Sequence, residues 1–133
     1  MKKLFLLVLS IMVLSSCSKE RLTPEGPTDV RIRNLSDIDF TNVIVDNGRE
    51  EMNYGSIAAK SVSDYQRLEI SYNEIQVSAT YDGMVYTNGE IDHTYHVYIG
   101  QDKVSYEIYP ESLGSGVLVV SIVYPYDGPI TDL

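Results

Sequence analysis

Residues 74–87 have the sequence EIQVSATYDGMVYT, which predicts a β-hairpin. Apolar and polar side chains alternate on both sides of an Asp-Gly pair at positions 82 and 83, a dipeptide typical of two-residue type I′ hairpin turns. Such a turn places Tyr81 opposite Met84 in an antiparallel hairpin. Because side chains of a strand point alternately to its two faces, we expect one face of this hairpin to line a core. That face carries Ile75, Val77, Ala79, Tyr81, Met84 and Tyr86, and Ala79 lies opposite Tyr86.

Strand-like runs and turn residues also alternate along the rest of the chain. From Asp29 onward, short runs rich in Val, Ile, Thr and Tyr are separated by turn residues about every ten positions, which indicates an all-β protein. We therefore predict a single antiparallel β-sandwich of seven or eight strands over residues 29–133, either Ig-like or transthyretin-like. The expected strands are 29–34, 39–46, 61–69, 74–81, 84–87, 94–99, 104–109 and 117–124.

Two of these strands suggest a ligand-binding face. A hairpin closing through residues 100–103 would pair Ile99 with Val104, Val97 with Tyr106 and Tyr95 with Ile108, so that these apolar residues point inward. The opposite face would then be polar and aromatic, with the imidazole of His96 directly across from the carboxylate of Glu107. Aromatic rings can serve as stacking platforms for sugars, although tyrosine is also an ordinary strand residue that packs its ring and keeps its hydroxyl in water. The candidate face consists of His96, Tyr98, Glu107 and Tyr109.

The last expected strand, residues 117–124, has a nearly continuous apolar sequence, VLVVSIVY. A strand with both faces apolar is typical of the centre of a sheet covered on both sides. We expect it to lie centrally in the sandwich or to form a contact between two copies of the chain, and to end at Pro125.

The N-terminus resembles a targeting signal. Lys2 and Lys3 precede an apolar run at residues 4–14, which as a helix would be about 16 Å long, roughly half of the hydrocarbon thickness that a transmembrane helix must cross. The run is therefore expected to be a signal peptide, comprising residues 1–16, that is removed from the mature protein.

The sequence that follows, Leu14-Ser15-Ser16-Cys17, resembles the lipobox of bacterial lipoproteins. Its small residues give a peptidase access to the bond before Cys17, and the thiol can accept a diacylglycerol. The alternatives are an ordinary secretory signal or a buried core cysteine. We expect Cys17 to carry covalent acyl chains such as palmitate, because two or more chains anchor a protein stably. Residues 17–28 would form the acylated terminus and a flexible tether.

The net negative charge of the chain argues against two classes of binding partner. The chain has 10 Lys and Arg against 19 Asp and Glu, a formal charge of −9, and loss of Lys2 and Lys3 with the signal leaves 8 basic residues and a charge of −11. Nucleic acid is not an expected partner, because binding to its phosphate backbone requires a basic surface. An acidic domain is also repelled by anionic lipid headgroups, so the lipid anchor alone would hold it at the membrane. Ser18 stands where an Asp retains enterobacterial lipoproteins at the inner membrane, which favours the outer membrane of the cell envelope.

No recognised catalytic or metal motif is present in the sequence. The chain has one Cys and two His, and in a strand His93 and His96 would point to opposite faces, so they could not share a metal ion. The acid-rich stretches 37–39 and 46–51 resemble calcium loops in composition but not in spacing, and Asn47-Gly48 is more simply a hairpin turn. The Gly-Ser-Gly sequence at 114–116 lacks the context of a nucleophile elbow. We therefore expect no enzyme activity, no metal and no cofactor besides the lipid, with a small hydrolase as the less favoured alternative.

Together with the lipobox, the segments 32–43, 53–57 (NYGSI) and 63–65 make the chain similar to small secreted lipoproteins of Bacteroidota. This resemblance covers nearly the whole chain and implies a location and a β-rich fold, but no chemistry and no site residues beyond 14–17. The expected function is a non-catalytic binding module for a protein or glycan at the outer membrane. The alternative is a structural accessory subunit that extends the β-sheet of a larger envelope complex.

Overall fold

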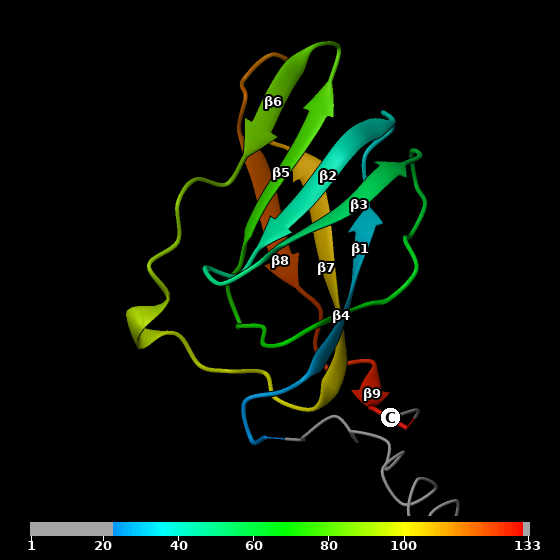
Figure 1. Ribbon diagram of the computed structural model, residues 1–133. Coiled ribbons are helices and arrows are strands. Elements are labelled where there is room, and N and C mark those ends of the chain that lie inside the picture. Colours follow the sequence, from blue (N-terminus) through cyan, green and yellow to red (C-terminus); the bar gives the residue numbers. More distant parts are fainter. Residues whose placement is uncertain (1–22, 132–133) are drawn as a thin grey trace, which may run out of the picture.

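The computed structural model describes residues 23–131, which form two β-sheets packed face to face (Figure 1). One sheet has the strand order β4-β1-β7-β8, with β9 paired to β7, and the other has the order β3-β2-β5-β6. The predicted all-β sandwich is therefore confirmed. The strands are β1 (Thr28–Asn34), β2 (Phe40–Asp46), β3 (Glu51–Ile57), β4 (Gln66–Leu68), β5 (Gln76–Tyr81), β6 (Met84–Thr87), β7 (Asp102–Pro110), β8 (Leu118–Ile122) and β9 (Gly128–Pro129).

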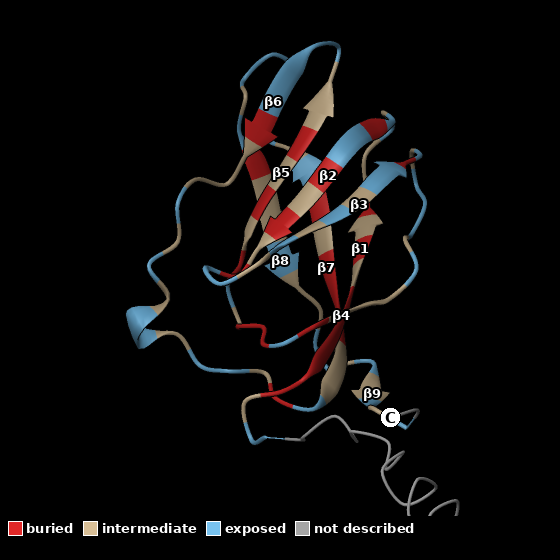
Figure 2. Cartoon of the chain, in the orientation of Figure 1, coloured by how far each residue is buried: buried red, intermediate tan, exposed pale blue. Residues whose placement is uncertain are grey.

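The core fills the space between the two sheets, and buried residues alternate with partly exposed ones along β5 (Figure 2). Within the core, the rings of Phe40 and Tyr86 meet edge to face, with centroids 6.1 Å apart. This geometry is favoured by the quadrupoles of the two rings. The buried cluster consists of Val30, Ile32, Phe40, Val43, Val45, Ile57, Leu68, Ile75, Val77, Ala79, Tyr86, Val104, Tyr106, Ile108 and Leu118.

The hairpin of β5 and β6 has the predicted register. Tyr81 pairs with Met84 and Ala79 pairs with Tyr86. Asp82 and Gly83 both have positive φ angles, of 49° and 73°, as a type I′ turn requires. The apolar face lines the core as far as the last pair of residues, where Met84 is 42% exposed because the hairpin extends beyond the sandwich.

The second predicted hairpin is wrong. Residues 94–99 form no strand: His93–Tyr95 is a short 3-10 helix, η2, and the expected inward residues Tyr95 and Val97 are 91% and 69% exposed. Two local preferences explain the difference. The side chain of Asp92 accepts hydrogen bonds from Thr94 and caps η2, and the segment then bonds to residues 71–73 rather than to β7.

The neighbours of β7 are instead β1, which is parallel to it, and β8, which is antiparallel. The residues of β7 that the sequence assigned to the core, Val104, Tyr106 and Ile108, are indeed buried. Alternation along a strand thus identified the buried face correctly, although it could not identify the partner strand.

Three further strands differ from expectation. β8 lies at the end of its sheet rather than at its centre, so its apolar sequence does not reflect a central position. β3 was not expected as a strand, because its sequence, EMNYGSI, lacks regular alternation. Its pairing with β2 contains register shifts near Gly55, whose φ is 70°. The expected strand at 61–69 shrinks to the three residues of β4.

The folded part of the chain begins earlier than Asp29. Thr23 and Gly26 exchange two backbone hydrogen bonds, of 3.0 and 3.2 Å, and Gly26 and Pro27 are buried. The side-chain amide of Gln101 donates to the carbonyl of Thr23 at 2.7 Å. Residues 23–28 are therefore part of the domain rather than of a flexible tether. The expected signal peptide and lipobox lie outside the described residues.

Candidate functional site

The structure does not assemble the four residues of the expected ligand face. Leu14, Ser15, Ser16 and Cys17 lie outside the described residues. His96 and Tyr98 follow η2, where the imidazole Nε2 of His96 is 3.6 Å from the carboxylate of Glu74 rather than beside Glu107. Glu107 instead pairs with Arg33 of β1 at 3.0 Å, and Tyr109 lies near the far end of β7.

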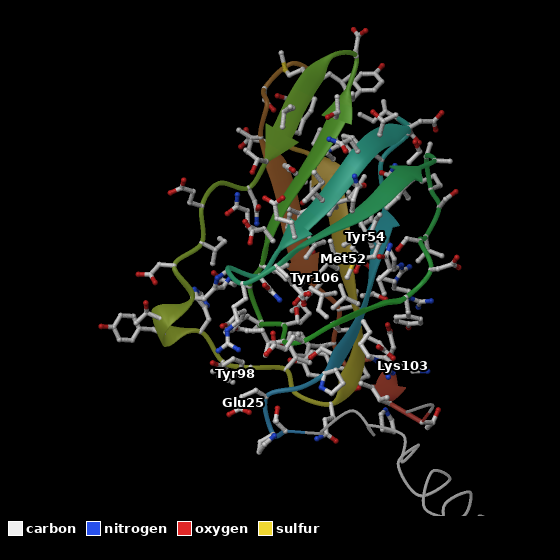
Figure 3. The ribbon with its side chains drawn as sticks, viewed as in Figure 1. Glu25, Met52, Tyr54, Tyr98, Lys103 and Tyr106 are labelled. Carbon is white, nitrogen blue, oxygen red and sulfur yellow. The ribbon has the colours of Figure 1, made fainter. Side chains whose placement is uncertain are left out.

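Tyr98 belongs to a different group of rings, which the structure brings together and the sequence did not indicate. Its ring stacks on that of Tyr72, with centroids 5.0 Å apart, and His93 stacks on the same ring, with centroids 4.4 Å apart. His96 meets His93 edge to face at 6.0 Å. We call these four residues the aromatic cluster. Tyr98 lies at the end of the sandwich where the described chain begins, the end that also carries Glu25 (Figure 3).

Hydrogen bonds to the core hold the ring in the middle of the stack. Tyr72 is 6% exposed, and its carbonyl accepts a hydrogen bond from the hydroxyl of Tyr106. The hydroxyl of Ser71 donates in turn to that of Tyr106 at 2.9 Å. Burial raises the pKa of Tyr106 above its ordinary value, because the phenolate would be poorly solvated there. The position of Tyr72 is therefore fixed, and its ring provides a rigid surface for the two rings stacked on it.

His93 is positioned by η2 on one side and by the β2–β3 turn on the other. Gly48 has a φ of 83°, and a Cβ atom at this position would lie 3.1 Å from Nδ1 of His93. A glycine therefore lets the turn approach the imidazole closely while adopting a left-handed conformation. Asn47, which is buried, shapes the same turn: its side-chain oxygen accepts from the amides of Arg49 and Glu50 at 2.9 and 2.8 Å.

A pocket of about 370 Å³ opens beside the aromatic cluster. Its rim is polar: the guanidinium of Arg49 is half exposed and lies 3.5 Å from Glu69, and Asp92 and Thr94 are exposed. Hydrogen bonds from Thr94 hold the pKa of Asp92 below its ordinary value, so this carboxylate is ionised at neutral pH. The pocket combines a partly exposed tyrosine ring, a cation and hydrogen-bonding groups. Its lining consists of Asn47, Gly48, Arg49, Tyr72, Asp92, His93, Thr94 and Tyr98.

One atom of this site has no hydrogen-bond partner within the described part of the chain. Nε2 of His93 is buried and unsatisfied. Burial, followed by the neighbouring His96, lowers the pKa of His93 from 6.5, so the imidazole is neutral at pH 7. A neutral imidazole offers one donor and one acceptor nitrogen. This nitrogen is buried among protein atoms and is not exposed to the pocket.

The relation between the two histidines corrects an expectation. In a strand they would point to opposite faces, but η2 places residues three apart on the same side, so their rings meet.

Among residues 23–131, no group of three or more His, Cys, Asp or Glu side chains is arranged to hold a metal ion. No sequence pattern indicates Tyr72 or Arg49 as site residues, because both enter the site through contacts between distant loops. Within the same residues, no helix is long and apolar enough to span a bilayer.

No family model and no curated protein matches the chain. Among solved structures, the chain is similar to an NMR structure of a protein from Eubacterium rectale, with a TM-score of 0.51 and 17% sequence identity. The match covers 77% of this chain and 94% of the other. At this level of identity the similarity concerns the fold alone.

Proposed function

We propose that this protein is a lipid-anchored, non-catalytic binding module of the bacterial cell envelope, and that it binds a glycan at the aromatic cluster. The observation that carries the proposal is the stack of His93, Tyr72 and Tyr98 beside a polar pocket. A sugar ring has an apolar face of C–H groups and a periphery of hydroxyls. The aromatic stack can pack against the apolar face of the sugar, and the polar rim of the pocket can bind its hydroxyls.

Three features support a saccharide at this position. The outermost ring, Tyr98, is 40% exposed, so part of its surface is open to a ligand. Arg49 and Asp92 supply charged hydrogen-bonding groups, which orient ligands in pockets of this size. Because the stack rests on buried Tyr72, the site is largely formed before a ligand arrives.

The anchor is proposed from the lipobox at residues 14–17. Five residues separate Cys17 from Thr23, the first residue of the described fold. Six residue-to-residue steps span at most about 21 Å, so acylation of Cys17 would hold the domain close to the membrane surface. The absence of Asp at position 18 favours the outer membrane as the destination.

We also propose that the sandwich is transthyretin-like rather than Ig-like. In Ig constant-type domains the first strand pairs with the second, and the sheets have four and three strands. Here β1 pairs with β4 and β7 and not with β2, and each sheet has a path of four strands. The strand orders β4-β1-β7-β8 and β3-β2-β5-β6 therefore favour the transthyretin-like type.

A structural role is the second candidate, and the position of β8 favours it. β8 ends its sheet, with Val119, Val120 and Ile122 only half buried, so an added strand could pair with its free edge. Ile122→Pro would test this role, because Val123 donates its N–H to β7 and the N–H of Ile122 therefore points to the free edge. Loss of a stoichiometric envelope complex on this change, with the monomer still folded, would support the second candidate over the first.

The glycan proposal is tested by binding measurements on the chain from residue 17 with Cys17→Ala, which removes the site of acylation. The probes are purified oligosaccharides from peptidoglycan and from lipopolysaccharide. We expect one class to bind, Tyr98→Ala to weaken its binding at least tenfold, and Tyr98→Phe to retain most of the affinity, because stacking needs the ring. Tyr109→Ala is the matched control, since Tyr109 is also 40% exposed but lies outside the cluster. Failure of every oligosaccharide to bind, or equal effects of Tyr98→Ala and Tyr109→Ala, would contradict the proposal.

A further inference from the structure

A second depression lies at the other end of the sandwich. The turn between β1 and β2 and the loop between β7 and β8 meet there, far from the first described residues (Figure 1). Between them is an open groove of about 460 Å³. Its walls are mainly apolar, with one charged pair on the rim: Leu35, Ile38, Tyr109 and Leu113 line it together with Asp37 and Lys60. We call it the distal groove.

The apolar side chains of this end are unusually exposed. Leu113 is 66% exposed, and Tyr109, which also lines the groove, is 40% exposed. Exposed apolar residues that gather in one region, with polar residues around them, are typical of protein-interaction sites. In a monomer, this surface would keep these large apolar side chains in water.

Hydrogen bonds hold the groove in place from both sides. On one side, the amide of Gly114 donates to the hydroxyl of Tyr86 at 2.8 Å, and the carbonyl of Gly116 accepts from the amide of Thr87 at 3.1 Å. These bonds fix the loop that carries Leu113 against β6. On the other side, the buried amide of Asn34 donates to the carbonyl of Ile38 at 2.8 Å. A groove with fixed walls requires little ordering when a partner binds.

The charge around this end is acidic. Asp37, Asp39, Asp82 and Glu111 are exposed on its turns and loops. The nearby cation, the ammonium of Lys60, is 3.6 Å from the carboxylate of Asp37 and is therefore already paired. A second copy of the chain would bring the same acids to this surface and be repelled. A partner with Lys or Arg around an apolar side chain would complement it in charge.

If the chain is cleaved before Cys17, as proposed above, the segment between Cys17 and Thr23 is too short to reach the groove. Asp102 lies next to Gln101, which contacts Thr23, and β7 extends from there to Pro110 at the groove, a distance of about 26 Å for eight residue steps. The six steps from Thr23 back to Cys17 span at most about 21 Å. The segment between Cys17 and Thr23 therefore cannot reach the distal groove of its own chain.

From these observations we infer that the distal groove docks a protein partner that inserts one apolar side chain between Tyr109 and Leu113 and surrounds it with Lys or Arg. This inference is independent of the glycan site, which lies at the opposite end of the sandwich. It assigns the two ends of the domain to two different partners.

The test uses synthetic ten-residue peptides as probes. Each carries a single Leu, Ile or Phe flanked by Lys and Arg, and a matched set has Glu in place of every basic residue. Binding to the chain from residue 17 with Cys17→Ala is measured by fluorescence anisotropy. We expect basic peptides to bind with an affinity that falls as salt is raised, and acidic peptides to bind at least tenfold more weakly.

Two variants locate the binding. Leu113→Asp is expected to weaken binding at least tenfold, because it places a charge in the groove. Val97→Asp is the control: Val97 is 69% exposed, as Leu113 is 66% exposed, but lies at the other end of the domain. Thermal unfolding of both variants checks that each is folded. Failure of all basic peptides to bind, or equal weakening by the two variants, would overturn the inference. A dimer in sedimentation that Leu113→Asp dissociates would assign the groove to a second copy instead.

Discussion

The ring of Tyr98 stacks on the ring of Tyr72 with centroids 5.0 Å apart, although the two residues come from different connections between strands. A bridge between the backbones of the same two residues holds them in register. One ring is buried and the other is partly exposed, so the pair links the core to the surface. The stability of the core and the shape of the candidate glycan site therefore depend on the same contacts.

Tyr106→Phe is expected to destabilise the domain by about 1–3 kcal/mol. The change removes the hydroxyl that pairs with Ser71 and with the carbonyl of Tyr72, leaving both groups unsatisfied in the interior. Chemical denaturation measures the effect. Tyr109→Phe, which removes an exposed hydroxyl, is the control and should change the free energy of unfolding by less than about 0.5 kcal/mol. Similar values for the two variants would show that the buried hydroxyl contributes nothing.

The stability of the domain is expected to fall as the pH decreases below about 6.5, in part because of His93. Its pKa in the folded state is lower than the ordinary value of 6.5, so the unfolded chain binds a proton at a higher pH than the native state does. The free energy of unfolding therefore decreases from about pH 7 down to the folded pKa. His93→Phe keeps a ring in the stack and should flatten the curve between pH 5.5 and 7.5. An unchanged slope in this variant would contradict the assignment.

Gly26→Ala is expected to destabilise the domain by about 1–3 kcal/mol, as overpacking does. A Cβ atom at this position would lie 2.1 Å from the carbonyl oxygen of Glu69, so the backbone must shift. Thermal unfolding of the variant tests whether residues 23–28 are part of the fold. Glu25→Ala, one residue earlier, serves as the control and should have little effect. A melting temperature unchanged by Gly26→Ala would show that this segment is not packed as described.

Cys17→Ala is expected to move the protein from the membrane fraction to the soluble fraction of cells without changing its fold. The thiol is the proposed site of acylation, whereas the described core lies entirely within residues 23–131. Fractionation and mass spectrometry of the N-terminal peptide measure the change, and circular dichroism checks the fold. Membrane association of the variant without any bound lipid would contradict the proposed anchor.

The sequence predicts local structure in this protein better than long-range pairing. Alternation and the Asp-Gly turn were sufficient to place Tyr81 opposite Met84, because a two-residue loop fixes the register of its strands. The parallel pairing of β1 with β7 joins residues about 74 positions apart, and no local pattern specifies it. The predicted hairpin at 94–109 failed because Asp92 caps a short helix before a strand can begin.

The candidate site was predicted only in part for the same reason. The sequence identifies Tyr98 as an exposed aromatic residue. The neighbours it predicts for Tyr98, Glu107 and Tyr109, depend on a strand pairing that the structure does not contain. Tyr72, His93 and Arg49 come together from three separate loops, and their positions depend on the tertiary fold. Composition indicated that tyrosine was unusually frequent, with 11 residues, but not which of them would stack.

NMR titration of the chain with envelope oligosaccharides directly tests whether the aromatic cluster binds a sugar. The aromatic signals of Tyr98, Tyr72 and His93 report on the cluster, and those of Tyr65 and Tyr109 report on other surfaces. Binding of a sugar at the cluster is expected to cause saturable shift changes at the first three residues and none at the other two. Spectra that do not change with any oligosaccharide, or that change only at Tyr65 or Tyr109, would contradict it.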